Sequence, residues 1–272
     1  MDKKVIKELV PPVFLRMITG LFYGWHGNYS SWNEATKKSG GYDSLSILEK
    51  VKTSSLKVKN GSAVYERDSL IFDHIEYSFP LLTGLLWIAG RNNGKLNVLD
   101  FGGSLGSTYF QNKLFLDTLT DVNWCIVEQP EVVNIGIENF EDQRLHFFYS
   151  IDECLKTYDI HMVLLSSVLQ YLEEPYRLLD EIISRKPDYI IIDRTPFVKG
   201  NDRITIQTVN PKIYKGSYPC WFFNKNKFVN SLIPSYKMIV EFNALDRANI
   251  NSEFKGFIFQ KATEDIQETS CI

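Results

Sequence analysis

The chain has 272 residues, of which 44% are hydrophobic and 23% charged, so its composition predicts a packed globular protein and excludes intrinsic disorder. Its formal net charge of −3 at pH 7 argues against a nucleic acid as the main partner. Its four cysteines form no C-x-x-C pair and no His/Cys cluster with zinc spacing, so we expect free thiols and no metal site.

The sequence contains no apolar run of membrane-spanning length, so no integral membrane segment is expected. No small-residue cleavage site follows an apolar core near residue 1, which excludes a signal peptide and favours a cytoplasmic protein. The apolar stretch Val13–Trp25 has two interpretations, binding to a membrane surface or packing on its own domain. The oligomeric state is not indicated by any pattern in the sequence.

Residues 1–90 are predicted to form a mainly helical cap that takes part in substrate binding. A loop rich in glycine and aromatic residues begins at Gly24, and Ser31 is the predicted cap of a helix from Trp32, with Glu34 completing a capping box. Further helical patterns cover Lys3–Val10, Tyr42–Lys52 and Tyr65–Ala89. The last of these is predicted to kink at Pro80 and to end at Gly90–Gly94.

From residue 91 onward, strands and helices alternate. Continuous apolar runs predict five buried parallel strands, at Leu96–Asp100, Trp124–Glu128, Leu145–Tyr149, Met162–Ser166 and Tyr189–Asp193. The helices predicted between these strands are Thr108–Leu119, Glu131–Phe140 and Pro175–Arg185. This alternation predicts a doubly wound α/β sheet.

The regular alternation of strands and helices stops after the fifth predicted strand. Residues 194–223 are predicted to form an insertion that acts as a lid, with one strand at Ile204–Val209. A helix at Lys225–Leu232 is followed by two strands, Tyr236–Asn243 and Phe254–Lys261, which form a closing antiparallel hairpin. The predicted domain therefore spans residues 91–262, and residues 263–272 form a polar tail.

The stretch Val98–Ser107 carries the clearest chemical signal. An apolar strand ends in Asp100, and three glycines at positions 102, 103 and 106 precede the next helix. Such a turn leaves backbone N–H groups open to a ligand. The dinucleotide fingerprint G-x-G-x-x-G is not met, because Ser104 and Ser107 replace its second and third glycines. A nicotinamide or flavin dinucleotide is therefore disfavoured.

An acidic residue, Glu128, ends the second predicted strand. A carboxylate at this place accepts hydrogen bonds from both hydroxyls of a ribose. Because NAD-binding proteins use the same contact, Glu128 predicts a nucleoside but does not separate one cofactor from the other. Gln129 is the next candidate for a contact with adenine or ribose.

Five alternating strand–helix units with a closing antiparallel pair resemble the class I S-adenosylmethionine-dependent methyltransferases, over residues 96–261. The resemblance implies a Rossmann-like, seven-stranded sheet and S-adenosyl-L-methionine as the cofactor. The segments Gly27–Ala35 and Val98–Gly106 also resemble a bacterial methyltransferase family whose members tend to be encoded among genes for surface polysaccharides. That second resemblance concerns the substrate only.

The first resemblance implies roles for residues 102–106, which we call the glycine loop, and for Asp100 before it. Asp100 holds the amino group of the methionine moiety, directly or through water, and Gly102, Gly103 and Gly106 let the backbone approach the ligand. Ser104 stands where the family commonly has glycine, and we expect Gly103 to supply the missing flexibility.

Three further positions are implied to contact the cofactor. The turn after the third strand meets the adenine in this fold, through Ser150 or Asp152, although Asp152 is equally well placed to cap a helix. Ser166 begins the turn after the fourth strand, at the mouth of the sheet. Many small-molecule methyltransferases carry histidine near Gln170, and glutamine is not a general base.

The catalytic base therefore has to come from elsewhere. Asp193, at the tip of the fifth strand, is the first candidate, followed by His74 and His26. Arg194 either holds a carboxylate or phosphate of the substrate or forms a structural pair with Asp193.

Aromatic residues are predicted to line the substrate side. Tyr171 either faces cofactor and substrate or packs in the core. Tyr29, Trp32 and Trp221 either form a wall for a sugar ring or pack within the cap. The sequence thus predicts a methyltransferase for a small polar acceptor, a sugar or sugar nucleotide of surface glycan synthesis. The alternative is a non-catalytic protein that binds the cofactor or a nucleotide sugar. A nucleotide-sugar oxidoreductase is disfavoured by the failed dinucleotide fingerprint.

Overall fold

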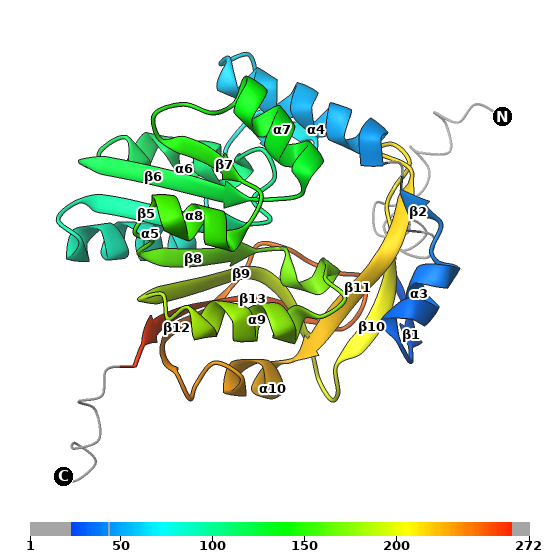
Figure 1. Ribbon diagram of the computed structural model, residues 1–272. Helices are drawn as coiled ribbons and strands as arrows, with labels where there is room; N and C mark the ends of the chain where they lie inside the picture. Colours follow the sequence, from blue (N-terminus) through cyan, green and yellow to red (C-terminus); the bar gives the residue numbers. More distant parts are fainter. Residues whose placement is uncertain (1–22, 43, 263–272) are drawn as a thin grey trace, which may run out of the picture.

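A computed structural model describes residues 23–42 and 44–262 (Figure 1). The predicted helix Lys3–Val10, residues 13–22 of the apolar stretch and the polar tail 263–272 lie outside the described residues. Among the helices that are described, none is long and apolar enough to cross a membrane.

A mixed sheet forms the centre of the molecule (Figure 1). Its parallel strands are β5 (Lys95–Phe101), β6 (Asp121–Val127), β7 (Leu145–Phe148), β8 (Met162–Ser166) and β9 (Tyr189–Val198). They lie in the order β7-β6-β5-β8-β9, which is the doubly wound order 3-2-1-4-5. The hairpin of β12 (Tyr236–Asn243) and β13 (Glu253–Lys261) follows, with β13 antiparallel to β9. The predicted Rossmann-like sheet with a closing hairpin is confirmed.

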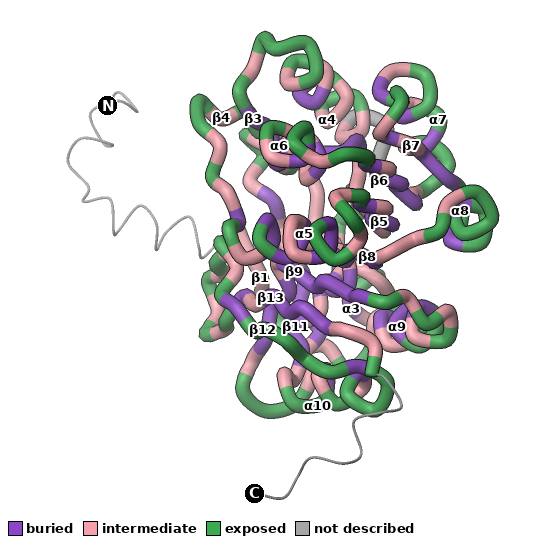
Figure 2. The backbone as a smooth tube through the Cα atoms, turned by 90° about the vertical axis from the view of Figure 1, so that its left-hand side faces the viewer, coloured by how far each residue is buried: buried purple, intermediate pink, exposed green. Residues whose placement is uncertain are grey.

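Helices cover both faces of this sheet, and each face has its own apolar cluster. On one face lie α5 (Phe79–Arg91), α6 (Ser107–Leu116) and α7 (Pro130–Asn139), packed around the fully buried Trp124. On the other lie α8 (Ile151–Thr157), α9 (Pro175–Ser184) and α10 (Lys225–Asn230), packed around Phe257. Figure 2 shows the strands largely buried between these layers. The three-layer packing fixes the carboxyl ends of the strands as a rigid edge.

An antiparallel arm extends the sheet beyond β9. It consists of β10 (Arg203–Thr208), β11 (Gly216–Asn224), β1 (Gly24–Tyr29) and the short β2 (Gly41–Tyr42). The end of β11 runs parallel to the end of β9, with Phe223 opposite Phe197. The predicted lid over residues 194–223 is therefore mostly sheet, and the loop predicted from Gly24 is a strand. Its partner β10 is far away in sequence, which no local pattern reveals.

The helix α3 (Trp32–Lys38) has Ser31 as its N-cap residue, as predicted. The hydroxyl of Ser31 accepts a hydrogen bond from the Glu34 N–H at 3.2 Å, and the Glu34 carboxylate reaches back to the N–H of Ser30 at 3.0 Å. The next helix, α4 (Ser44–Lys59), is longer than predicted at its carboxyl end.

The single helix predicted over Tyr65–Ala89 is wrong. The structure has a hairpin of β3 (Tyr65–Arg67) and β4 (Leu70–Phe72), followed by α5. Asp68 and Ser69 adopt positive φ angles of 52° and 68°, as a two-residue hairpin turn requires. Pro80 lies in the first turn of α5, where its fixed φ suits helix initiation, and so it starts the helix instead of kinking it.

Candidate functional site

The order of the parallel strands reverses between β5 and β8, and doubly wound sheets bind ligands outside the carboxyl ends of the strands at this point. A cavity of about 620 Å³ lies there, and we call it the main cavity. Its walls come from the ends of β5, β8 and β9, from the β3–β4 hairpin, from the arm and from the β12–β13 loop. Segments from both ends of the chain thus meet at one site.

The glycine loop forms one side of the main cavity. Gly102, Ser104 and Gly106 have φ angles of 73°, 53° and 92°, so every second residue of the loop is left-handed. Gly103 is not left-handed, and a Cβ there would lie 2.5 Å from Asp100 Oδ2. Gly103 is therefore needed for close approach to Asp100. The expectation that it supplies flexibility for Ser104 is wrong, because Ser104 itself adopts the left-handed conformation.

The helix α6 begins directly after this loop. Its N-cap is Gly106, which offers no side chain to cap the first turn, and both Ser107 and Thr108 line the main cavity. The Ser107 hydroxyl donates a hydrogen bond to Glu66, a buried carboxyl on β3. Burial raises the pKa of Glu66. Backbone N–H groups without a side-chain cap favour an anionic or polar ligand group at this end of the helix.

Asp100 lies beneath the loop and is only 1% exposed. Its Oδ2 accepts a hydrogen bond of 2.9 Å from the indole N–H of Trp124. Burial raises the pKa of Asp100 to about 7, and the nearby Glu128 carboxyl acts in the same direction against the Trp124 bond. A buried carboxyl of this kind is stabilised as a carboxylate when a cation binds beside it.

Glu128 crosses from the end of β6 to the glycine loop. Its Oε1 accepts from the Ser104 N–H at 3.2 Å, and its Oε2 accepts from the Gln129 N–H at 2.8 Å. Burial raises the pKa of Glu128, while these two bonds lower it. Both carboxylate oxygens retain a lone pair for a further donor.

Glu128 contacts the cavity-lining Ser104 but does not itself line the main cavity, and the other residues predicted to contact the adenosine do not line it either. Gln129 and Ser150 are exposed, and the hydroxyl of Ser150 caps α8 by accepting from the Glu153 N–H at 3.2 Å. Asp152 lies in the first turn of α8 and pairs with Arg185 at 2.7 Å, so its carboxylate is directed toward α9. Ser150 and not Asp152 is the N-cap of α8, so the cap interpretation of Asp152 is wrong, and its contact with adenine stays a prediction.

The turn after β8 joins the main cavity to β9. Ser166 and Ser167 line the cavity, and Ser167 has a φ of 56°. Gln170, in the short helix η1 (Leu169–Tyr171), is 1% exposed and donates to the Ser167 hydroxyl at 3.0 Å and to the Arg194 carbonyl at 3.2 Å. Gln170 therefore joins the turn after β8 to Arg194 of β9, and it does not line the main cavity.

Asp193 is the last residue of β9 that pairs with β8, and Arg194 follows it within the same strand. The side chain of Arg194 lines the main cavity and holds Asp246 with two bonds, of 2.8 and 3.0 Å, and Asp68 at 3.3 Å. The predicted structural pair with the Asp193 side chain is replaced by these two carboxylates, which come from the β12–β13 loop and from the β3–β4 turn. Arg194 has a φ of 54°.

Asp193 is 2% exposed and lies opposite Ser166 in the β8–β9 ladder. It lines a separate space of about 30 Å³, which we call the side chamber, and does not line the main cavity. Its Oδ1 accepts from the Arg194 N–H at 2.9 Å. Burial raises the pKa of Asp193 to about 7, although the charges of Arg194 and Arg67 oppose this shift.

Aromatic rings form the side of the main cavity opposite the glycine loop. They belong to Trp25, Trp32, Tyr171, Tyr214, Tyr218 and Phe254. The Tyr171 hydroxyl donates to Gln207 at 2.9 Å, and the Tyr171 ring meets Tyr218 edge-on at 5.6 Å. Trp221 lies outside the cavity and stacks behind Trp32, with ring centroids 6.1 Å apart. Such a wall suits a flat or ring-shaped acceptor.

Three predicted residues do not reach the main cavity. His74 is exposed and pairs with Asp73 at 2.6 Å. His26 follows Trp25 on β1, and because side chains alternate along a strand, His26 lies on the side away from the cavity. Tyr29 does not line the cavity either, and Lys38 lies over its ring at 5.3 Å.

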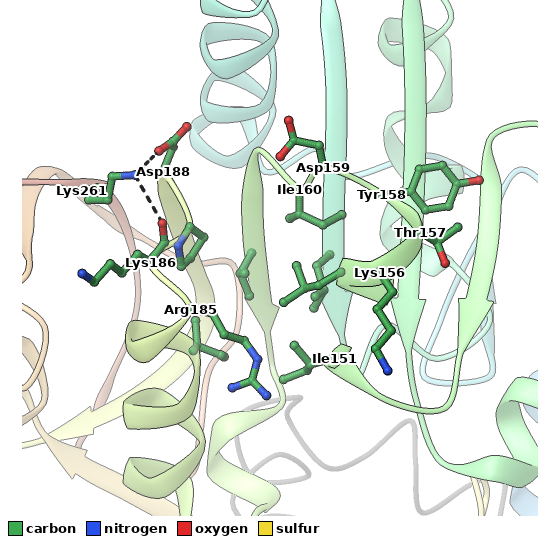
Figure 3. A pocket seen from close by; sticks show the side chains of 15 residues that line it. Ile151, Lys156, Thr157, Tyr158, Asp159, Ile160, Arg185, Lys186, Asp188 and Lys261 are labelled. Atoms are coloured by element: carbon green, nitrogen blue, oxygen red, sulfur yellow. Dashed lines mark hydrogen bonds and ion pairs between the residues drawn. The ribbon is translucent and has the colours of Figure 1, made fainter. Parts of the chain in front are cut away.

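A second cavity, of about 470 Å³, lies at the opposite edge of the sheet (Figure 3). It opens between α8 and α9, at the amino ends of β8 and β9, over an apolar floor that includes Ile151 and Ile160. Its rim carries four cations, Lys156, Arg185, Lys186 and Lys261. No residue of the glycine loop lines it, so we place the functional site at the main cavity.

The sequence analysis missed several residues of the main cavity, namely Trp25, Arg67, Asp68, Gln207, Tyr218 and Asp246. Asp68-Ser69 stands between Tyr65–Arg67, which carries two charged residues, and the apolar Leu70–Phe72, so the helical pattern over Tyr65–Ala89 obscured this hairpin. Asp246 was visible only as part of a polar turn between two strands.

No protein-family model matches this chain, and none of the curated proteins matches it. Among solved structures, the N-terminal domain of EvdMO1 with S-adenosylhomocysteine and D-fucose is similar at a TM-score of 0.47 and 14% identity, covering 82% of this chain and 98% of that one. A 1,6-didemethyltoxoflavin-N1-methyltransferase from Burkholderia thailandensis, with its substrate and S-adenosylhomocysteine, has a TM-score of 0.44 and 11% identity over 88% and 94%. A SAM-dependent methyltransferase from Methanosarcina mazei has a TM-score of 0.46 and 14% identity over 64% and 97%. All three TM-scores lie below 0.5, so the chemistry below rests on this chain's own residues.

Proposed function

We propose that this chain is an S-adenosylmethionine-dependent methyltransferase acting on a small polar acceptor. The observation that carries the proposal is the pair of carboxyls on either side of the glycine loop, Asp100 beneath it and Glu128 across it. Asp100 is placed to neutralise an ammonium group, and Glu128 is placed to accept from ribose hydroxyls. One nucleoside ligand that carries both groups is S-adenosylmethionine.

The shape of the loop fits this cofactor. A Cβ at Gly102 would lie 2.5 Å from Val168, and one at Gly103 would meet Asp100, so glycine at both positions lets the loop pack closely on Val168 and on the carboxyl that is proposed to bind the ammonium group. The uncapped first turn of α6 faces the same space and suits the cofactor's carboxylate. Bound there, S-adenosylmethionine supplies an activated methyl group on a sulfonium.

The aromatic half of the main cavity is the acceptor side of the proposal. Trp32, backed by Trp221, offers a ring face, and the hydrogen-bonded Tyr171 and Gln207 offer polar atoms beside it. A sugar ring uses this combination of an apolar face and polar edges. A role in surface glycan synthesis rests on the resemblance of Gly27–Ala35 and Val98–Gly106 to the polysaccharide-associated family.

The first experiment measures binding by calorimetry with S-adenosylmethionine, S-adenosylhomocysteine and NAD⁺. We expect the two sulfur compounds to bind and NAD⁺ to give no heat, because the loop does not meet the dinucleotide fingerprint. Binding of NAD⁺ without a response to the sulfur compounds would contradict the proposal.

A non-catalytic binding protein remains the alternative, and one observation favours it. Gln170 and the cavity-lining side chains offer no histidine to act as a base. Transfer of a radiolabelled methyl group to a panel of free sugars and nucleoside-diphosphate sugars distinguishes the two functions. Binding without transfer to any of them would favour the alternative.

A further inference from the structure

The side chamber behind the main cavity has the size of a single water site. Its volume is about 30 Å³, and a chamber of about 10–15 Å³ already accommodates one water when polar partners are present. Four residues that carry hydroxyls, Ser78, Ser107, Thr108 and Ser166, line it together with Asp193. The chamber is therefore polar enough to hold a water in place.

The side chamber and the main cavity share a wall. Ser107, Thr108, Ser166, Arg67 and Arg194 line both spaces. Asp193 lines only the side chamber, so its carboxyl lies one layer behind the acceptor site. A group at this position reaches an acceptor through an intervening water and not directly.

The charged and titratable groups around Asp193 come from several parts of the chain. Arg194 follows Asp193 on β9, and Arg67 and Tyr65 of β3 line the side chamber with it. Asp246 and Asp68 bind Arg194. Arg194 is engaged by Asp246 and Asp68, whereas Arg67 has no ion pair with any carboxylate among the described residues. Arg67 is thus the cation that is free to stabilise a negative charge on Asp193.

We propose that the side chamber holds one ordered water that carries the acceptor's proton to Asp193. The inference rests on the proposed function. The acceptor's oxygen or nitrogen forms a bond to the methyl carbon while the carbon–sulfur bond breaks and its electron pair goes to sulfur. The proton of the acceptor passes to the water, the water passes a proton to Asp193, and Asp193 later releases it to solvent.

The other acids of the site are poorly placed for this role. Asp246 and Asp68 are bound to Arg194, and a paired carboxylate is a weaker base. Asp100 lies under the glycine loop, on the cofactor side. His74 and His26 lie outside the main cavity, and Glu66 lines neither the main cavity nor the side chamber. Asp193 is therefore left as the proton acceptor.

The first test needs no acceptor. A crystal structure of the protein with S-adenosylhomocysteine is expected to show one water within hydrogen-bond distance of Asp193 and of a hydroxyl in the shared wall. The Ser78→Val variant fills the chamber, and Ser78 makes no side-chain cap bond whose loss would complicate the result. Ser78→Ala is the matched control, because it leaves the volume open. A chamber closed by side chains, or dry in both the native protein and Ser78→Ala, would overturn the inference.

The second test uses turnover with the sugar or nucleotide sugar that the methyl-transfer assay identifies. Asp193→Asn is expected to lower kcat by about a hundredfold or more and to remove the acidic limb of the pH–rate profile. Ser78→Val should lower kcat by about tenfold, and Ser78→Ala, which leaves the volume open but removes one hydroxyl of the lining, should lower it by less. Affinity for S-adenosylhomocysteine should remain native in all three variants.

Two failures remain distinguishable. If the native protein does not bind S-adenosylhomocysteine, the proposed function fails, and this inference fails with it. If binding and transfer are both present and Asp193→Asn keeps the native kcat and pH–rate profile, only the proton route is wrong.

Discussion

The two cavities of this protein lie at opposite edges of the same sheet and differ in how their charges are arranged. In the second cavity, Lys261 pairs with Asp188 at 2.5 Å and Arg185 pairs with Asp152 at 2.7 Å, as in ordinary surface ion pairs. In the region of the main cavity, Asp100 and Asp193 are buried and form no ion pair within the described part of the chain, and burial raises the pKa of each to about 7.

The backbone shows the same difference. Ser104, Ser167 and Arg194 are left-handed residues other than glycine beside the main cavity. Ser104 and Ser167 follow the ends of β5 and β8, and Arg194 follows the last residue of β9 that pairs with β8. The rim of the second cavity has one such residue, Lys186. Strained backbone and shifted pKa values gather where a fold gives up stability for function. Cavity volume alone would not have separated the two.

The largest effect is expected from Gly103→Ala. The added Cβ would lie 2.5 Å from the Asp100 carboxylate, while the backbone conformation of Gly103 suits any residue. Asp100 therefore has to move, and we expect affinity for S-adenosylhomocysteine to fall by about a hundredfold, or roughly 3 kcal/mol. Calorimetry measures the loss.

Gly90→Ala is the matched control for this variant, because a Cβ at Gly90 meets nothing within 4 Å and the residue is helical. It should bind like the native protein. Native affinity in Gly103→Ala would show that Asp100 is not part of the binding site.

A smaller effect is expected from Glu128→Ala. Loss of the carboxylate removes the proposed contacts with the ribose hydroxyls, and affinity should fall by more than about tenfold, or roughly 1.4 kcal/mol. Lys156→Ala, in the rim of the second cavity, is the comparison and should change affinity by less than about twofold. An equal loss of affinity in Glu128→Ala and Lys156→Ala would contradict the assignment of the functional site to the main cavity.

The pH dependence of binding tests Asp100 itself. Because burial raises its pKa to about 7, Asp100 is mostly protonated at pH 6 in the free protein, and a bound ammonium favours the carboxylate. Affinity for S-adenosylhomocysteine should therefore rise with pH, by up to about tenfold per unit below pH 7, and level off above it. Calorimetry between pH 5.5 and 8.5 measures this slope, and Asp100→Asn should flatten it. A native profile that is already flat would show that Asp100 does not meet a cation.

The smallest effect is expected from Ser104→Gly. Ser104 has a φ of 53°, which costs about 1 kcal/mol for a residue with a side chain. Glycine at this position should raise the free energy of unfolding by up to about that amount, because its gain in unfolded-chain entropy partly offsets the relief of strain. Affinity should change by less than about threefold, since only the Ser104 N–H meets Glu128. Chemical denaturation and calorimetry measure the two quantities.

The parallel core of the fold was predictable because its signals are local. Val98–Asp100 and Tyr189–Asp193 are continuous apolar runs that only a buried strand explains, and Asp100 and Glu128 end such runs. Their placement at one edge of the sheet then follows from the parallel order. The prediction of bounds was least accurate at the ends of helices, as for α4.

The acceptor side was not predictable in the same way. Gly24–Tyr29 becomes a strand through its pairing with β10, and Asp68 becomes part of the site through Arg194. These contacts join residues that no window of local sequence contains. The hairpin β3–β4 was also hidden, because Leu70 and Ile71 are exposed apolar residues that happened to match a helical period.

The long separation in sequence between these contacting residues affects the order in which the molecule folds. Asp68 and Arg194 are 126 positions apart, and Trp25 and Asn249 are 224 apart. Closing such long loops costs entropy before any contact forms, so we expect the parallel sheet to assemble first and the acceptor wall to close last. A chain shortened to residues 91–262 would then retain the cradle for the nucleoside but lose Trp25, Trp32, Arg67 and Asp68 from the pocket. We therefore expect the proposed selectivity for the acceptor to arise in the final step of folding.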